Sequence, residues 1–288
     1  MKKIVAGIIL ASMLMVTLAG CGSKDGFDTK RAVNAITRED GSGTRGAFVE
    51  LFELEEKLED GSKRDLISKD IGVENNTNTI LTTVKEDTYA IGYISMGSLN
   101  EEVKAVQIDG TEASADNVKS GDYKISRPFA IATKSDPSEV AKDFIDFILS
   151  KEGEEVIADS YIAITDNAEG YAGDKPSGTI TVGGSSSVSP LMEKLIERYK
   201  EVNPNASVEL QISDSSIGMT QTIDGAYDIG MASRALKDSE KEELEDTQIA
   251  LDGIAVIVNL ENEVSGLSQD EIRRIYLGEV EAWSDIIE

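Results

Sequence analysis

The sequence of 288 residues contains no histidine, a single cysteine, and only 28 basic side chains against 54 acidic ones. Without histidine, the chain cannot form a serine–histidine–aspartate triad, a cysteine–histidine pair or an imidazole-ligated zinc site. A single cysteine excludes an internal disulfide and a metal cage built from thiolates alone. The formal net charge of −26 argues against nucleic acid as a partner, because phosphate backbones are bound by basic surfaces.

Hydrophobic residues nevertheless make up 40% of the chain, which is ordinary for a globular protein. This fraction excludes a wholly disordered acidic chain, which would contain too few apolar side chains to form a core. The chain is longer than a domain built around one hydrophobic core usually is. We therefore expect two domains of roughly 100–150 residues each.

The N-terminal residues have the pattern of an export signal. Two lysines precede an apolar run over residues 4–18, which is too short for an ordinary membrane span. The run ends in Leu18-Ala19-Gly20-Cys21, which is similar to the bacterial lipobox. We expect residues 1–20 to be a lipoprotein signal peptide, and a lipid on Cys21 to anchor the protein to the outer face of the cell membrane. The alternative is a buried structural cysteine that happens to follow a signal peptide.

A small, polar tether is expected over residues 21–26. After it, a pattern of strand, turn rich in glycine or serine, and helix occurs three times. The predicted strands cover residues 32–36, 179–182 and 207–212, and the turns after them cover residues 38–44, 183–187 and 213–216. Pro190 suits the first turn of the second helix, because the amide that proline lacks would have had no partner there.

Each of these turns leads into the first amides of a helix, which lack intrahelical partners and carry partial positive charge. Such a place binds anions, and serine or threonine hydroxyls add uncharged donors. Arg38 and Arg45 flank the first turn, and the guanidinium fork fits an oxyanion. Convergence of the three turns predicts a site for a small tetrahedral oxyanion. The alternative is that serine and aspartate only cap helices and glycine only turns the chain.

The run Arg38-Glu39-Asp40-Gly41-Ser42-Gly43-Thr44-Arg45 resembles the signature of the phosphate-binding proteins that serve ABC-type phosphate importers. Further segments that resemble the same family are residues 184–190, 213–216, 228–234, 252–259, 267–268, 276–279 and 283–285. The resemblance that these segments carry extends over nearly all of the chain after the expected anchor. Their order is that of a circular permutation, since the Arg38 turn usually follows the segment that stands last here. The alternative, a fragment missing a middle piece, is opposed by the presence of every expected segment once.

The resemblance implies an α/β fold of the type II periplasmic-binding-protein kind, in which two lobes joined by two crossing hinge strands enclose a ligand cleft. One lobe, with the Arg38 turn, would comprise residues 27–121 and 260–288. The other, with the serine turns, would comprise residues 122–259. The runs at residues 127–132 and 254–258 are expected to carry the crossings.

The resemblance also implies roles for individual residues. The expected phosphate ligands are Arg38, Ser42, Gly43, Thr44, Ser186, Ser187, Ser215, Ser216, Ser233 and Arg234. Asp40 would hold the Arg38 guanidinium in place, and Arg45 would support the site. Family members carry an aspartate at about the position of Ser233, where it accepts the proton of hydrogen phosphate. Asp214 is our candidate for a substitute proton acceptor, and a helix N-cap is the equally weighted alternative for this residue.

The sequence therefore predicts a non-enzymatic protein that captures inorganic phosphate and delivers it to the membrane subunits of an ABC importer. We expect a monomer with no cofactor and no metal. The alternatives are a binding protein for another tetrahedral oxyanion such as sulfate or molybdate, and a lipid-anchored adhesin or sensor. A phosphotransferase is a further alternative, but the chain has no Gly-Lys dipeptide and so lacks a GxxxxGK[ST] phosphate loop.

Overall fold

The computed structural model describes residues 26–58, 63–165 and 167–287. The expected signal peptide, the lipid anchor at Cys21 and all but the last residue of the tether lie outside the described residues. Among the described helices, none is both long enough and apolar enough to cross a bilayer.

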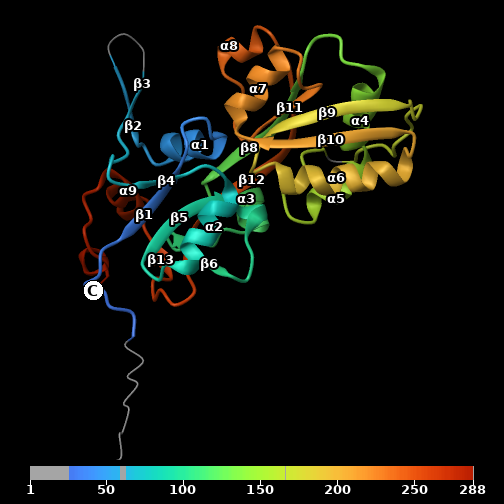
Figure 1. Cartoon of the computed structure of the whole chain (residues 1–288). Coiled ribbons are helices and arrows are strands. Elements are labelled where there is room, and N and C mark those ends of the chain that lie inside the picture. Colours follow the sequence, from blue (N-terminus) through green and yellow to red (C-terminus); the bar gives the residue numbers. More distant parts are fainter. Residues whose placement is uncertain (1–25, 59–62, 166, 288) are drawn as a thin grey trace, which may run out of the picture.

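The fold is α/β, and a nine-stranded sheet runs through it (Figure 1). The strands along the sheet are, in order, β10 (Ala206–Ser213), β9 (Gly178–Ser185), β11 (Ile229–Ala232), β8 (Ser126–Thr133), β12 (Glu245–Asn259), β5 (Ala90–Ser95), β1 (Asn34–Arg38) and β4 (Gly72–Glu74), with β6 (Val103–Ala105) pairing with β12 off this path. Two smaller sheets pair β2 (Glu55–Lys57) with β3 (Lys63–Asp65) and β7 (Gln107–Ile108) with β13 (Gly266–Leu267).

The described helices pack around these sheets. They are α1 (Gly43–Leu51), α2 (Thr77–Glu86), α3 (Ala115–Ser120), α4 (Glu139–Ile148), α5 (Lys151–Ala158), α6 (Ser189–Val202), α7 (Ser215–Ile223), α8 (Asp238–Lys241) and α9 (Gln269–Leu277), with 3₁₀ turns at Met96–Ser98 and Trp283–Asp285. In Figure 1, α1, α2 and α9 surround one half of the molecule, and α4 to α8 surround the other.

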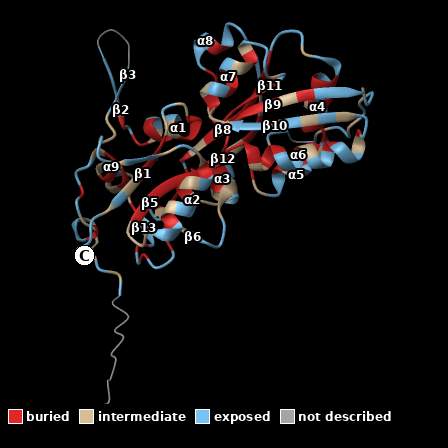
Figure 2. Ribbon diagram, in the orientation of Figure 1, coloured by how far each residue is buried: buried red, intermediate tan, exposed pale blue. Residues whose placement is uncertain are grey.

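The two lobes meet at β8 and β12. The first part of β12 pairs with β8, from Glu245 to Gly253, and its second part pairs with β5, from Ile254 to Val258. One continuous strand thus passes from the sheet of one lobe into the sheet of the other. The central strands are buried, whereas β10 at the sheet edge alternates between exposed and half-buried residues (Figure 2).

Each lobe has its own hydrophobic core, as expected of a two-lobed fold. In the first, Phe48 stacks on Tyr93 with the ring centroids 3.8 Å apart, and Trp283 near the end of the chain joins the same cluster. In the second, Phe144 and Tyr199 pack with residues of β8, β9 and β11. The lobe boundaries given above stay a prediction at the level of single residues.

The predicted strand–turn–helix pattern is present in all three places. β9 and β10 contain the predicted strands, Pro190 lies in the first turn of α6, and α7 ends two residues before Gly225. The first strand differs, because β1 begins at Asn34 and continues to Arg38. Its register explains the shift: residues 34–35 pair with β5, and residues 36–38 pair with β4.

Candidate functional site

Seven buried hydroxyl side chains from both lobes meet where the strands β1, β4, β9, β10 and β11 end. We call them the hydroxyl cluster: Thr44, Thr77, Ser185, Ser186, Ser187, Ser215 and Ser233. Thr44 is at its centre, with its oxygen 2.7 Å from that of Ser187 and 3.4 Å from that of Ser233. The sequence predicted that Thr44 and the serines would converge from separate segments, and the structure brings them together.

Four helices begin at the hydroxyl cluster: α1, α2, α6 and α7. Ser42 and Asn76 cap α1 and α2, accepting hydrogen bonds from the amides of Arg45 and Thr79. Among the residues that the structure describes, the amides of Gly43 and Thr44 have no hydrogen-bond acceptor. Unpaired first-turn amides and aligned peptide dipoles make the end of α1 favourable for an anion.

Arg38 supplies a buried guanidinium at the edge of the hydroxyl cluster. Its Nη2 donates to Ser186 at 3.1 Å, and its Nη1 donates to Thr77 at 3.3 Å. The carboxylate that holds it is Glu39, which accepts from Nε at 2.8 Å and from Nη2 at 2.7 Å. The expectation that Asp40 holds Arg38 is wrong. Asp40 lies on the outside of the turn with its side chain 98% exposed, 3.5 Å from Arg45 instead.

The other two expected arginines are also engaged by carboxylates. Arg45 pairs with Asp65 of the β2–β3 hairpin. Arg234 forms two hydrogen bonds with Glu240, at 2.7 and 2.8 Å, and a longer one of 3.4 Å with Ser216. Burial opposes ionisation of Glu240, but the bonds from Arg234 and the Lys237 amide, together with the positive charges of both residues, outweigh it and lower the pKa of Glu240. Neither Arg45 nor Arg234 forms a short hydrogen bond with the hydroxyl cluster. Ser216 and Arg234 therefore lie at the margin of the cluster.

Asp214 is the N-cap of α7, since its Oδ1 accepts from the amide of Ile217 at 2.8 Å. The N-cap interpretation of this residue is confirmed. Its carboxylate also packs against the other lobe, because a Cβ added to Gly41 would lie 2.5 Å from it. The backbone closes the same contact, with the amide of Ser216 donating to the carbonyl of Gly41 at 3.3 Å.

Gly43 brings the backbone of α1 directly against the opposite lobe. A Cβ at this position would lie 2.5 Å from the Ser215 hydroxyl and 2.8 Å from the Ser233 hydroxyl. Such separations are too short for real atoms, so a side chain here would force the two serine side chains or the lobes themselves to shift. Glycine is therefore required at this point of contact.

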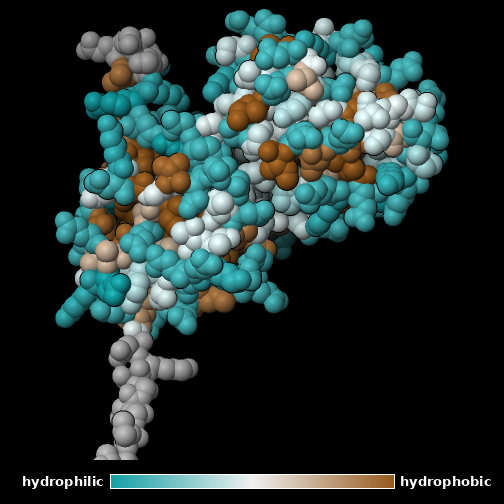
Figure 3. All heavy atoms as spheres, in the orientation of Figure 1, coloured by the Kyte–Doolittle hydropathy of each residue, from teal (hydrophilic) through white to brown (hydrophobic). Residues whose placement is uncertain are grey.

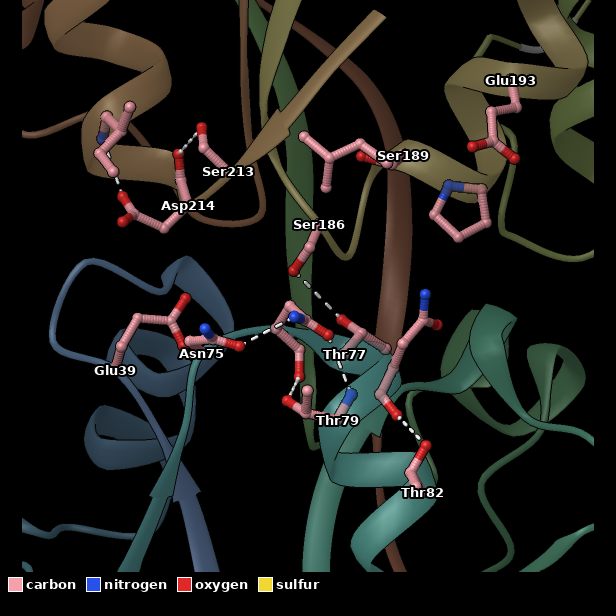
Figure 4. Close-up of a pocket in the computed structure, with 15 residues that line it drawn as sticks. Glu39, Asn75, Thr77, Thr79, Thr82, Ser186, Ser189, Glu193, Ser213 and Asp214 are labelled. Carbon is pink, nitrogen blue, oxygen red and sulfur yellow. Dashed lines mark hydrogen bonds between the residues drawn. The ribbon is translucent and has the colours of Figure 1, made fainter.

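A pocket of about 780 Å³ opens from the hydroxyl cluster to solvent between the lobes (Figure 4). Ser186 and Thr77 belong to both the pocket and the cluster, and their side chains point toward each other. Three carboxylates line the pocket, from Glu39, Glu193 and Asp214. Hydrophilic residues cover most of the face shown in Figure 3. Hydrophobic atoms also border the opening between the lobes, where the pocket lining includes two exposed isoleucines, Ile212 and Ile217.

Sequence reasoning missed three residues of this site: Glu39, Thr77 and Arg127. A signal for Thr77 was present, because residues 72–74, 75–76 and 77–86 form a fourth strand, turn and helix with an asparagine N-cap. Arg127 carried no such signal, since it stands within the strand β8. Its Nη2 donates to the hydroxyl of Thr44 at 2.9 Å.

The chain matches the family model described as "PBP superfamily domain" over residues 24–152 and 169–287. It is 49% identical to "Phosphate-binding protein PstS 2" of Streptococcus agalactiae, over 93% of this chain and 92% of that protein. It is 41% identical to the protein of the same name from Streptococcus pneumoniae, over 93% of this chain and 94% of that one. The chain belongs to the family of phosphate-binding proteins.

A crystal structure of a phosphate-binding protein of a phosphate ABC transporter from Streptococcus pneumoniae is similar to this member of the family. It has 42% sequence identity and a TM-score of 0.70, and the match covers 89% of this chain and all of that one. Each of the two streptococcal relatives aligns with this chain in a single linear order over more than nine-tenths of its length. Both relatives therefore have the same order of segments as this phosphate-binding protein.

Proposed function

We propose that this protein captures inorganic phosphate outside the cytoplasm and delivers it to the membrane subunits of an ABC importer. The observation that carries this proposal is the 2.7 Å contact between the hydroxyls of Thr44 and Ser187, which belong to opposite lobes. Donors from two lobes that converge on one point can surround a small anion when the lobes close on it. The names of the similar proteins support phosphate as that anion.

The donors at this point match the chemistry of phosphate. The amides of Gly43 and Thr44, the guanidinium of Arg38 and the surrounding hydroxyls all offer hydrogens, and phosphate oxygens accept them. A net charge of −26 does not prevent binding. Surface charges farther away than a Debye length of about 8–10 Å are screened by salt, whereas donors within about 3 Å act at nearly full strength in a buried site.

We assign phosphate contacts to the ligand set expected from the sequence, with the exception of Ser42, and add Thr77. Gly43, Thr44, Ser186, Ser187 and Ser215 are supported by their place in or against the hydroxyl cluster. Ser42 is supported only as a helix cap, so we assign it a positioning role. The lipid anchor at Cys21, the monomeric state, and a role limited to binding without covalent chemistry belong to the same proposal.

Calorimetry of the purified protein with phosphate, arsenate, sulfate and molybdate at two pH values tests this function. We expect phosphate to bind at least about tenfold more tightly than sulfate, which corresponds to about 1.4 kcal/mol. A smaller difference would support the second candidate, a less selective oxyanion-binding protein. That candidate is favoured by Ser233, a neutral residue at a position where the resemblance implies an aspartate. Failure to bind any of the four anions would favour an adhesin or sensor.

A further inference from the structure

Arg127 lies on the crossing strand β8, in the interior between the two lobes. Its side chain is 2% exposed, and its Nη2 donates to the Thr44 hydroxyl at 2.9 Å. Its Nη1 is 3.2 Å from Oδ2 of Asp252, a fully buried carboxylate on β12. Among the described residues, Nε and Nη1 of Arg127 have no hydrogen-bond acceptor of good geometry. A buried cation with unused donors therefore stands directly behind the central hydroxyl of the site.

The bond from Arg127 determines what the Thr44 hydroxyl can do. A guanidinium has five N–H donors and no acceptor, so Thr44 must accept in this bond. A threonine hydroxyl has one hydrogen, which is thereby left for a partner on the other side. Ser187 at 2.7 Å lies on that side, within the hydroxyl cluster. Arg127 thus directs the hydrogen of Thr44 into the cluster.

Arg38 acts in the same way on two other hydroxyls of the cluster. Its two Nη atoms donate to Ser186 and Thr77, so the hydrogens of these hydroxyls are also free to point inward. Each arginine has one carboxylate against it, Glu39 for Arg38 and Asp252 for Arg127. The two carboxylates differ in position. Glu39 lines the pocket, whereas Asp252 is fully buried and does not belong to the pocket lining.

We propose that Arg127 is a positioning residue of the anion site, which acts through Thr44 by orienting its hydroxyl as a donor, and that Asp252 attenuates its positive charge. This inference rests on the proposed function, since it assigns a role in binding phosphate. It explains why a buried ion pair is placed at the point where the strands cross between lobes. The competing explanation is that the pair only holds β8 and β12 together.

The two explanations predict opposite changes in the affinity of Asp252→Asn for inorganic phosphate. If Arg127 orients Thr44 and Asp252 attenuates its charge, Arg127→Met weakens binding at least about tenfold, and Asp252→Asn strengthens it about threefold. If the pair is only structural, both variants break the same contact, and both weaken binding. Calorimetry at about pH 8, where Asp252 is ionised, measures both constants, and thermal unfolding of each variant establishes that it is folded.

A double-mutant cycle tests whether Arg127 affects phosphate binding through Thr44. Thr44→Val removes the hydroxyl, and we expect it to weaken binding about as much as Arg127→Met. In the double variant, the second change should add little, because both remove the same oriented donor. If Arg127→Met does not fold, Arg127→Met combined with Asp252→Asn avoids an unpaired buried carboxylate, and the same tenfold loss is expected.

Three results would overturn the inference while leaving the proposed function intact. The first is weaker phosphate binding in both Arg127→Met and Asp252→Asn. The second is a double variant of Arg127→Met and Thr44→Val in which the two losses of affinity multiply. The third is unchanged affinity when Arg127→Met is combined with Asp252→Asn. A wild-type protein that binds no phosphate would instead contradict the proposed function, and this inference with it. The two failures are therefore distinguishable in one set of titrations.

Discussion

Thr44 and Ser187 stand 143 residues apart in the sequence, yet their hydroxyl oxygens are 2.7 Å apart. Thr44 belongs to the first turn of α1, and Ser187 lies two residues before α6, so the contact joins two lobes. Neither lobe could form this site alone. Affinity for an anion and closure of the lobes are consequently one equilibrium, because the ligand can use both sets of donors only when the lobes are together.

Ser187→Ala should lower affinity for phosphate about tenfold, because an uncharged hydrogen bond contributes about 0.5–1.5 kcal/mol and the Thr44 hydroxyl also loses a partner. Thr82→Ala is a matched control. Thr82 lines the same pocket but bonds to the carbonyl of Asn78 in its own helix. Calorimetry with phosphate compares the two variants, and similar affinities would remove Ser187 from the ligand set.

Gly43→Ala should weaken phosphate binding at least about tenfold, because the added methyl group clashes with Ser215 and Ser233 across the cleft. Gly46→Ala is the control within the same helix, since a Cβ there meets no atom within 4 Å. Small-angle scattering with saturating phosphate should show a less compact molecule for Gly43→Ala than for Gly46→Ala. Identical scattering and affinity would contradict the proposed contact between the lobes.

Glu39→Gln and Asp40→Asn test which carboxylate holds Arg38. Glu39 forms two short bonds with the guanidinium, whereas Asp40 is almost wholly exposed. We expect Glu39→Gln to change phosphate affinity several-fold, because Arg38 loses its fixed position, and Asp40→Asn to have no measurable effect. An effect of Asp40→Asn as large as that of Glu39→Gln would restore the role that the resemblance implied for Asp40.

Burial raises the pKa of Asp252 to about 6, with Arg127 opposing the shift. The folded state therefore holds this proton more tightly than the unfolded state. The contribution of Asp252 to the free energy of unfolding is full below about pH 4 and declines as pH rises through about 6, by up to about 3 kcal/mol. Asp252→Asn lacks this decline. Urea unfolding at about pH 4, 6 and 8 should show the variant gaining stability relative to wild type with rising pH, and a constant difference would contradict the raised pKa.

The sequence by itself determined the local parts of the site. Ser42 and Asp214 cap the helices that follow them, and Pro190 lies in the first turn of α6. These features depend on residues a few positions apart, because a cap or a first-turn proline acts within one helical turn. The resemblance then connected these turns to one family, and the structure brings them together.

Only the tertiary structure decided which side chains face one another. Glu39 is the carboxylate that pairs with Arg38, because Asp40 points outward from the turn. The two acidic residues are adjacent in the sequence, so the sequence does not show which of them faces Arg38. Thr77 and Arg127 join the site because β4 pairs beside β1 and β8 crosses between the lobes. Such contacts follow from strand order, register and the closure of two lobes, which are set by packing between distant segments and not by any local pattern.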